Sequence, residues 1–299
     1  MRKQKSLQEL TIKDNFMFCA VMSDELHCRD CLELVLEIPI EKVTVCQEKS
    51  IIYHPGYRGI RLDVVARDED HTHYDVEMQV AMKPALGKRA RYYHSQLDMD
   101  MLKTGTDYHE LADAYVIFIC DYDPFGKGLY RYTWEMICKE DPELALQDGS
   151  RTVILSTKGQ NDQDEPEELV KFLKFVGAGA EESQWDYADA YVSRLQKTVA
   201  GIKADREMED MYMLLWNEIL RDEREEGRLE GRLEGRLEGK IEELVELILD
   251  VLSDLSGEIP EDVKHCLYDM KDEDILMHCF RKARKVSSME EFAEWLNTI

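Results

Sequence analysis

Two neighbouring segments of the chain have the composition of β-strands, and this pair limits the possible folds more than any other feature. Residues 60–67 (IRLDVVAR) are rich in β-branched and apolar side chains, and residues 72–81 (THYDVEMQVA) alternate between apolar and polar positions. A short polar segment, DEDH, separates them and is typical of a turn. Because side chains alternate in direction along a strand, Asp75, Glu77 and Gln79 share one face. We therefore expect a β-hairpin with one apolar and one polar face.

The segments around this hairpin mix helical and strand patterns. The continuous apolar run at residues 114–120 (AYVIFIC) is typical of a buried central strand. The other patterns predict helices over 14–22, 28–37 and 84–103, short strands over 42–46 and 50–53, and edge strands over 130–134 and 152–156. Together they predict an α/β fold, in which helices flank a mixed sheet.

The chain changes character after residue 160. The acidic segment 161–167 (NDQDEPE) is predicted to be a linker, and the residues that follow have helical patterns to the end of the sequence. The predicted organisation is an α/β domain over 1–160, a helical region over 161–225, a repeat over 226–241 and an all-α C-terminal region over 242–299.

A tetrapeptide repeat occupies residues 226–241, where three copies of Glu-Gly-Arg-Leu are followed by Glu-Gly-Lys-Ile. Its period is close to one helical turn, so like charges stack at i,i+4 and slightly destabilise an isolated helix. Each interior glycine costs about 1 kcal/mol relative to alanine. Two interpretations stay open. A second chain could stabilise a helix by pairing Arg columns with Glu columns, or the repeat could be a flexible charged linker.

The charge of the chain is unfavourable for binding nucleic acid, but it is unevenly distributed. The net charge is −25, and duplex DNA repels such a chain overall. Residues 1–160 contain 20 Lys and Arg against 27 Asp and Glu, a balance of −7, whereas residues 161–299 contain 18 against 36, a balance of −18. Most of the acidity therefore lies outside the predicted α/β domain.

The sequence also bears on the compartment. No stretch approaches the roughly 20 apolar residues that a membrane-spanning helix needs, and the basic N-terminus lacks the apolar run of a secretory signal. Eight cysteines are scattered along 299 residues, far more sparsely than in small disulfide-rich domains. We therefore expect a cytoplasmic protein with reduced thiols and no membrane partner.

The polar face of the predicted hairpin has the residue types of a metal-dependent hydrolase. Asp63 lies in the first strand, and Glu77 and Gln79 project from one face of the second, so the hairpin can bring two carboxylates together. Converging carboxylates repel one another unless a proton or a cation lies between them. Mg²⁺ prefers such oxygen ligands, and the backbone carbonyl of Met78 could add another. The alternative is that these are ordinary polar-face residues of a hairpin.

The predicted helix after the hairpin offers a phosphate contact. Arg89 and Tyr93 are four residues apart and share one helix face, and a guanidinium can hold a phosphate through two hydrogen bonds. Lys83, Lys88 and Arg91 add further positive charge nearby. The alternative is that Tyr93 belongs to the core and the basic residues form a solvated face.

The ordered set of these motifs resembles the PD-(D/E)XK nuclease superfamily. The matching runs are Arg61-Leu62-Asp63-Val64, Asp75-Val76-Glu77-Met78-Gln79 and Lys88-Arg89 followed by Tyr92-Tyr93. More narrowly, the chain is similar to the Rpn group of recombination-promoting nucleases, also described as transposases. The opening run Lys13-Asp14-Asn15-Phe16-Met17-Phe18, the residues Gly105, Tyr108 and Leu111, and the Glu-Gly-Arg repeat fit that group. The resemblance covers roughly residues 8–160 and the repeat.

The resemblance implies a restriction-endonuclease-like core and Mg²⁺-dependent cleavage of DNA, with Mn²⁺ as a possible substitute, linked to recombination or mobile DNA. It implies that Asp63 and Glu77 are metal ligands and that Asp14 is an acidic residue of the first helix that reaches the site. Arg61 is expected beside the site as a supporting residue. Gln79 occupies the position that gives the superfamily its lysine, as is common in the Rpn group, and Leu62 replaces the proline before the first acid.

Two rival functions follow from the same sequence. The first is a nuclease fold that no longer cuts and serves as an interaction or regulatory module, which the acidity and Gln79 favour. The second is a helical assembly protein in which the C-terminal half dominates. The function expected here is a Mg²⁺-dependent deoxyribonuclease that acts on DNA and forms a homo-oligomer through its C-terminal helices and repeat.

Overall fold

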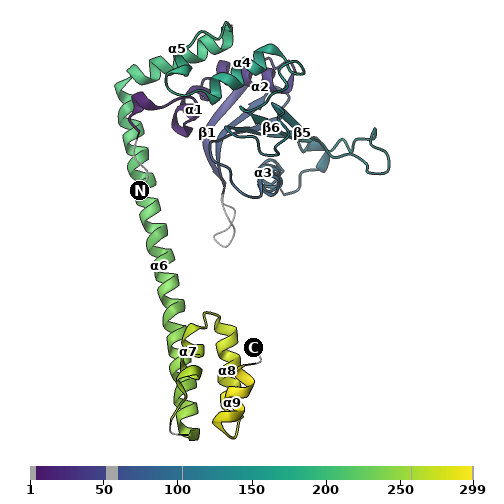
Figure 1. Ribbon diagram of the computed structural model, residues 1–299. Helices are drawn as coiled ribbons and strands as arrows, with labels where there is room; N and C mark the ends of the chain where they lie inside the picture. Colours follow the sequence, from purple (N-terminus) through teal and green to yellow (C-terminus); the bar gives the residue numbers. More distant parts are fainter. Residues whose placement is uncertain (1–4, 52–59, 103, 257, 298–299) are drawn as a thin grey trace. The chain divides into compact units, whose positions relative to one another are not determined.

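A computed structural model describes residues 5–51, 60–102, 104–256 and 258–297 (Figure 1). The chain divides into two compact units, Met1–Tyr212 and Met213–Ile299. The first contains the sheet and the predicted site residues, and the second is helical wherever it has regular structure. None of the helices in the described part of the chain has the length and apolar character required to cross a bilayer.

The described part of the first unit is built on a mixed six-stranded sheet with the order β1-β2-β3-β4-β6-β5. The strands are β1 (Val43–Ile51), β2 (Ile60–Asp68), β3 (His73–Gln79), β4 (Ala114–Cys120), β5 (Arg131–Trp134) and β6 (Ser150–Ser156). The β1–β2, β2–β3 and β5–β6 pairs are antiparallel, whereas β3–β4 and β4–β6 are parallel. The predicted α/β fold, hairpin and central apolar strand are confirmed.

Two of the strand predictions need correction. The segments 42–46 and 50–53 were expected as separate strands, but β1 runs without interruption from Val43 to Ile51, and residues 52–53 lie outside the described residues. Residues 152–156 were expected at an edge, but β6 lies between β4 and β5. Its four most buried positions, Val153 to Ser156, explain this placement, because a strand covered on both faces is usually an interior strand.

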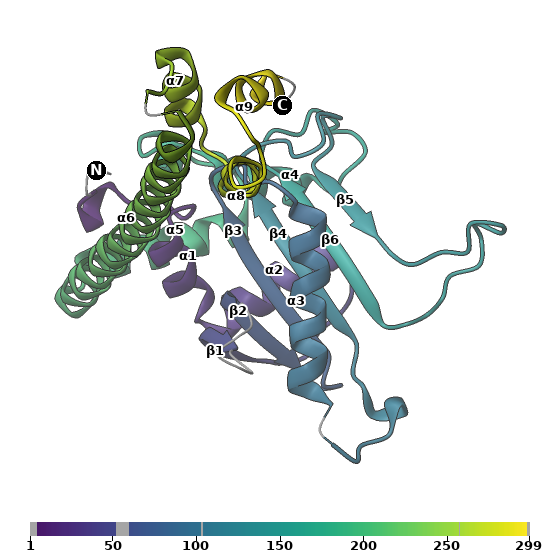
Figure 2. The same cartoon turned by 90° about the horizontal axis from the view of Figure 1, so that it is seen from below.

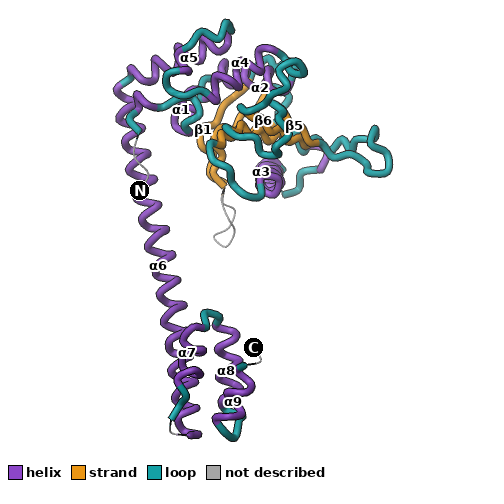
Figure 3. Tube along the Cα trace, viewed as in Figure 1, coloured by secondary structure: helices purple, strands orange, loops and turns teal. Residues whose placement is uncertain are grey.

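Helices cover both faces of the sheet (Figures 1 and 3). The helices of the first unit are α1 (Asn15–Met22), α2 (Glu25–Leu36), α3 (Leu86–Met101), α4 (Glu167–Gly177) and α5 (Ala190–Ala204), with short 3-10 turns at Leu7–Glu9, Tyr108–Glu110 and Glu182–Gln184. One face packs against α1, α2, α4 and α5 in the larger apolar core. Within the described residues, α3 is the helix that packs on the other face, and Figure 2 looks onto this side.

The first unit extends well past residue 160. Residues 161–166 are tied to the sheet rather than forming a linker, because the hydroxyl of Tyr130 donates to Asp162 at 3.0 Å and the backbone N–H of Tyr130 donates to Asn161 at 2.9 Å. Helices α4 and α5 then bury apolar faces in the main core. The completely buried side chains are those of Leu169, Phe172, Leu173, Val176, Val192 and Leu195.

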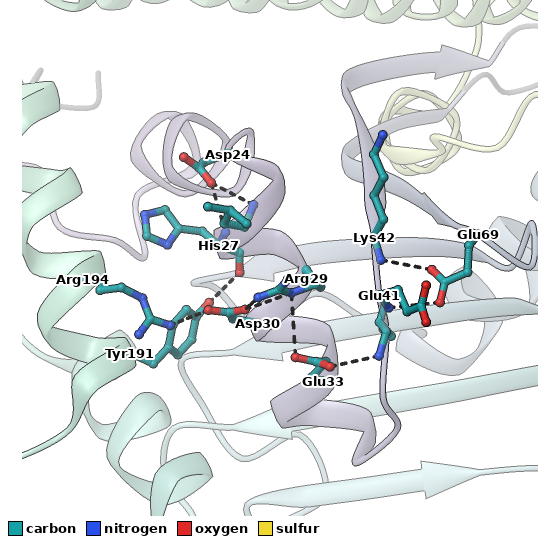
Figure 4. Close-up of polar contacts among 12 residues, drawn as sticks. Asp24, His27, Arg29, Asp30, Glu33, Glu41, Lys42, Glu69, Tyr191 and Arg194 are labelled. Carbon is teal, nitrogen blue, oxygen red and sulfur yellow. Dashed lines mark hydrogen bonds and ion pairs between the residues drawn. The ribbon is translucent and has the colours of Figure 1, made fainter.

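Polar contacts fix these later helices to the N-terminal half (Figure 4). The hydroxyl of Tyr191 on α5 donates to the carbonyl of His27 at 2.8 Å, and Arg194 forms an ion pair with Asp30 on α2. On the other side of α2, Glu33 accepts a hydrogen bond from the backbone of Ile40 at 2.9 Å. The physical boundary of this unit is therefore set by the burial of α4 and α5, not by the acidic segment.

The second unit contains the repeat. Helix α6 (Arg206–Ser256) runs through residues 226–241 without a break, so the backbone there is helical rather than a flexible linker. The helices α7 (Glu261–Asp269), α8 (Glu273–Ala283) and α9 (Met289–Leu296) pack with the last part of α6 around a core that includes Ile248, Leu252, Leu267, Leu276 and Phe292.

Candidate active site

Backbone pairing between β2 and β3 gives way to side-chain contacts at the two predicted acids. The register runs from Arg67–His73 to Val64–Val76. At the next position the backbone N–H of Asp63 donates to Oε1 of Glu77 at 3.0 Å. The backbone N–H of Met78 donates to Oδ2 of Asp63 at 3.1 Å. Each carboxylate is thus held by the backbone of the opposite strand, and the hairpin brings Asp63 and Glu77 together.

The face that holds these acids is polar in sequence but buried in the structure. Asp75, Glu77 and Gln79 are only 0%, 2% and 5% exposed, because α3 covers this face of the sheet. Burial and the neighbouring Asp63 raise the pKa of Glu77 from its ordinary value of 4.5 to about 8. Burial, Glu77 and Asp63 also raise the pKa of Asp75. Such a site favours a bound proton or a bound cation over bare negative charge.

Helix α3 supplies the positive charge that faces these acids. Arg89 donates to Oε1 of Gln79 at 2.9 Å and to the hydroxyl of Tyr93 at 3.1 Å, and its guanidinium lies 3.8 Å from Oε2 of Glu77. Gln79 in turn donates to the same oxygen of Glu77 at 3.4 Å. The four residues therefore form one connected network. The i,i+4 spacing of Arg89 and Tyr93 predicted their common face, and the structure brings both to the site.

The helix α1 contributes a residue that sequence reasoning missed. The amide of Asn15 donates to Oδ1 of Asp63 at 2.8 Å. Asp14 was expected here, but its carboxylate is engaged elsewhere, accepting from the backbone N–H of Thr11 at 2.8 Å and from Lys5 at 2.7 Å. The run of residues 13–18 at the helix start was the available signal, and within it the side chain that contacts Asp63 is Asn15, one residue after Asp14. An amide positions Asp63 without adding further negative charge.

The remaining predicted residues lie as follows. The side chain of Met78 is buried in the opposite core, so only its backbone is available to the site. The side chain of Arg61 lies outside the described residues. Lys83, Lys88 and Arg91 are exposed, and Lys83 is close enough to lower the pKa of Glu77, against the larger effects of burial and Asp63.

A second charged network lies at the ends of neighbouring strands. Asp121 follows β4, and its backbone N–H donates to the carbonyl of Gln79 at 2.9 Å. Its carboxylate accepts from Lys13 at 2.8 Å and from Lys158 and Thr157 at 2.7 Å. Burial opposes ionisation of Asp121, but these hydrogen bonds outweigh it and lower its pKa. Two lysines are therefore fixed beside the site at the carboxyl ends of β3, β4 and β6.

The donor set fits a hard divalent cation held by two carboxylates. Within the described ranges, no group of three or more His, Cys, Asp or Glu side chains is arranged to hold a metal ion. A site with only Asp63 and Glu77 suits Mg²⁺, which commonly keeps several waters and uses one or two carboxylates together with substrate phosphate. Burial and the nearby Asp63 raise the pKa of Glu77 despite the positive charge of Arg89, so the pair still favours a bound proton or cation.

Comparison with known proteins places the chain in a family. Residues 17–226 match the family described as the PD-(D/E)XK nuclease family transposase. The match includes the hairpin, α3, and the helices α4 and α5 of the first unit. No curated protein matches the chain, and no solved structure does.

Proposed function

We propose that this chain, which belongs to the PD-(D/E)XK nuclease family transposases, is a Mg²⁺-dependent nuclease that hydrolyses DNA phosphodiester bonds and acts in recombination or mobile-DNA transfer. Family membership supports a nuclease or transposase-like role. The observation that supports activity in this chain is the close approach of Asp63 and Glu77, each held by the opposite strand's backbone. An inactive relative would have no need to keep two buried carboxylates in this position.

Asp63 and Glu77 would hold the cation, and the carbonyl of Met78 could contribute a third oxygen. When bound, the cation would polarise a phosphoryl oxygen and help to generate hydroxide from water. Mn²⁺ could take the same place. The residues of the chain have the other roles: Asn15 positions Asp63, and Gln79 positions Glu77.

Gln79 cannot act as a strong base, because an amide does not take up a proton near neutral pH. Its Oε1 is already occupied by Arg89, so it links the cation site to the phosphate-binding side chain. Arg89 would bind the scissile phosphate, since a guanidinium can hold a phosphate through two hydrogen bonds. Its contact with Glu77 is long, at 3.8 Å, so the substrate could draw the guanidinium away from that carboxylate. Lys13, Lys83 and Lys158 would attract the flanking phosphates electrostatically despite the net charge of the whole chain.

The proposal is tested by incubating purified protein with single-stranded and double-stranded DNA in Mg²⁺, in Mn²⁺ and in EDTA. Cleavage that requires the metal is expected. Intact DNA under every condition would instead favour the rival, a nuclease fold that serves only as an interaction module.

We further propose that the chain self-associates through α6. The helix continues through the repeat although its glycines lower helix propensity. Among the side chains that the structure describes, a Cβ atom at Gly235 or Gly239 would meet nothing within 4 Å, so packing against them gives no reason for glycine at these positions. Close approach of a second helix would give one. Light scattering of the intact protein tests this, and a monomer at all concentrations would contradict it.

A further inference from the structure

An open pocket of about 600 Å³ lies on the α3 face of the sheet, away from the carboxylates. One wall is α3, where the small residues Gly87 and Ala90 leave space. The other wall consists of Phe125 and the end of β5, including Trp134. The floor is β6, from which Ile154 and Thr152 face the pocket. Its volume lies within the usual range of small-molecule sites, about 300–1,000 Å³.

The wall opposite α3 belongs to an aromatic cluster, which we define as Phe125, Tyr132 and Trp134, and of which Phe125 and Trp134 line the pocket. The ring centroids of Phe125 lie 4.8 Å from Tyr132 and 4.9 Å from Trp134. Although Tyr132 is buried, Phe125 and Trp134 are 41% and 42% exposed. Adjacent exposed apolar side chains can mark the site of a ligand or a partner.

The loop that presents Phe125 is held in place. Asp123 accepts from the backbone N–H groups of Phe125 at 3.1 Å and Gly128 at 2.7 Å, and from the hydroxyl of Tyr132 at 2.8 Å. Gly126 and Gly128 have φ angles of 64° and 68°, which permit this tight turn. The aromatic surface is therefore preorganised, so a ligand can stack on it with little loss of side-chain and loop entropy.

Arg91 in the pocket lining, together with Lys88 and Lys127 near lining residues in the sequence, favours an anionic ligand with a flat ring. Lys88 and Arg91 on α3 and Lys127 beside Phe125 are all exposed. The acid in the lining, Glu135, is paired with Arg151. Aromatic side chains bordered by cations are the features with which proteins bind single-stranded nucleic acid, since bases stack on the rings and phosphates meet the cations.

The sheet register connects this pocket to the candidate active site. Glu77 on β3 is paired with Phe118 on β4, and Phe118 is paired with Ile154 in the pocket floor. Two strand spacings separate them, roughly 10 Å. Arg89 lies over Phe118 between the two, with its guanidinium carbon 5.4 Å from the ring centroid.

We propose that the pocket binds an unpaired nucleobase of the DNA, stacked on Phe125 and Trp134, and that the substrate is single-stranded or locally melted near the cut. Bases inside an intact duplex are stacked on one another and cannot reach the rings. The position of the cut relative to this base rests on the proposed nuclease function, whereas base binding does not.

The test measures binding in EDTA at low salt, so that it does not depend on cleavage. A fluorescently labelled oligonucleotide reports affinity by anisotropy for wild type, Trp134→Ala, Trp134→Phe and Trp185→Ala. Trp185 is a matched control, since it is 59% exposed and lies after a 3-10 turn outside the pocket. Stacking of one base is worth about 1–3 kcal/mol, so Trp134→Ala is expected to weaken single-strand binding about 5- to 150-fold. Trp134→Phe should retain most of the affinity, and Trp185→Ala all of it.

A second readout detects stacking directly. Unlabelled single-stranded oligonucleotide should quench part of the intrinsic tryptophan fluorescence of wild type. The quench should disappear in Trp134→Phe, which still binds, and persist in Trp185→Phe. The proposal is overturned if wild type does not bind single strands, if Trp134→Ala binds as tightly as Trp185→Ala, or if Trp134→Ala changes only the oligomeric state, which would assign the aromatic surface to a second copy of the chain.

The outcomes for the pocket and for the nuclease are separable. Binding with quenching but without metal-dependent cleavage keeps the pocket and removes the nuclease function. Cleavage without quenching keeps the nuclease and removes the pocket.

Discussion

Asp63 and Glu77 each accept a hydrogen bond from the backbone of the other's strand, at 3.1 Å from Met78 and at 3.0 Å from Asp63 itself. The two hydrogen bonds satisfy the backbone N–H groups of Asp63 and Met78, beyond the last paired residues of the hairpin. They also fix both carboxylates. The arrangement holds two negative charges together in a buried place, which is unfavourable unless a proton or a cation is shared there.

Metal affinity should depend strongly on pH. Burial and Asp63 raise the pKa of Glu77 to about 8, so below that pH a proton competes with the cation for the site. Affinity for Mn²⁺, measured by calorimetry, is expected to rise about tenfold per pH unit up to about pH 8 and then to level off. An affinity that is the same at pH 6.5 and pH 8.5 would show that Glu77 does not take part.

The stability of the metal-free protein should fall as pH rises. Because the pKa of Glu77 is higher in the folded state than its ordinary value of 4.5, the folded state binds more protons between about pH 4.5 and pH 8. The stabilisation from that proton is complete below this window and is lost as pH rises through about 8. Thermal unfolding in EDTA should show this decline in wild type, and Glu77→Gln should make it shallower, leaving the part due to Asp75, whose pKa is also raised. An equal slope in both proteins would argue against the assignment.

Arg89 should affect both the pH profile and substrate binding. Its positive charge lowers the pKa of Glu77, so Arg89→Ala is expected to move the rise in metal affinity to higher pH. Loss of its phosphate contact should also weaken DNA binding. Arg89→Lys keeps the positive charge but loses the bidentate geometry of the guanidinium. Compared with Arg89→Ala, it should therefore bring the pH dependence of metal affinity closer to wild type than it brings the DNA affinity. Identical behaviour of the two variants would contradict this division of roles.

Asn15 should matter more than Asp14 for activity. Removing the amide in Asn15→Ala leaves Oδ1 of Asp63 without that donor, and loss of such a supporting contact typically costs about 10- to 100-fold in metal affinity or activity. Asp14→Asn should leave cleavage nearly unchanged, because the Asp14 carboxylate contacts Thr11 and Lys5. Parallel cleavage assays of the two variants show which residue supports the site. A greater loss of cleavage in Asp14→Asn than in Asn15→Ala would assign that role to Asp14.

The first unit should not fold without α4 and α5. A chain ending at residue 160 would expose the apolar core that these helices cover, including Phe172 and Leu195. Each such buried side chain contributes about 1.5–3 kcal/mol, and together they rival the whole stability of a domain, about 5–15 kcal/mol. Expression and circular dichroism should show a folded chain that ends at residue 226 and an unfolded one that ends at residue 160. A cooperative transition in the shorter chain would contradict this.

The sequence predicted the parts of the fold that depend on local periodicity. The hairpin, the central strand and α3 follow from alternation and helical spacing, and the pairing of Asp63 with Glu77 follows from the hairpin. The end of the first unit could not be predicted in this way, because α4 and α5 belong to it only through contacts with helices more than a hundred residues earlier, such as the pair Arg194–Asp30.

The same limit applies to the candidate site. A polar strand face suggests solvent, whereas α3 buries Glu77 and Gln79, and only the tertiary structure shows how burial changes their chemistry. The contact between Asn15 and Asp63 joins residues 48 positions apart. Spacing alone could not distinguish it from a contact made by Asp14. The aromatic cluster likewise assembles from a turn and an edge strand that have no common motif.

The most direct test of the account is plasmid cleavage by Asp63→Asn and Asp70→Asn, each with Mg²⁺ and with EDTA. Both substitutions replace one carboxylate in the same hairpin, but Asp70 is exposed in its turn. The account predicts metal-dependent cleavage by wild type and Asp70→Asn, and a loss of about 100-fold or more in Asp63→Asn while the fold is retained. Equal cleavage by both variants, or cleavage that persists in EDTA, would contradict it.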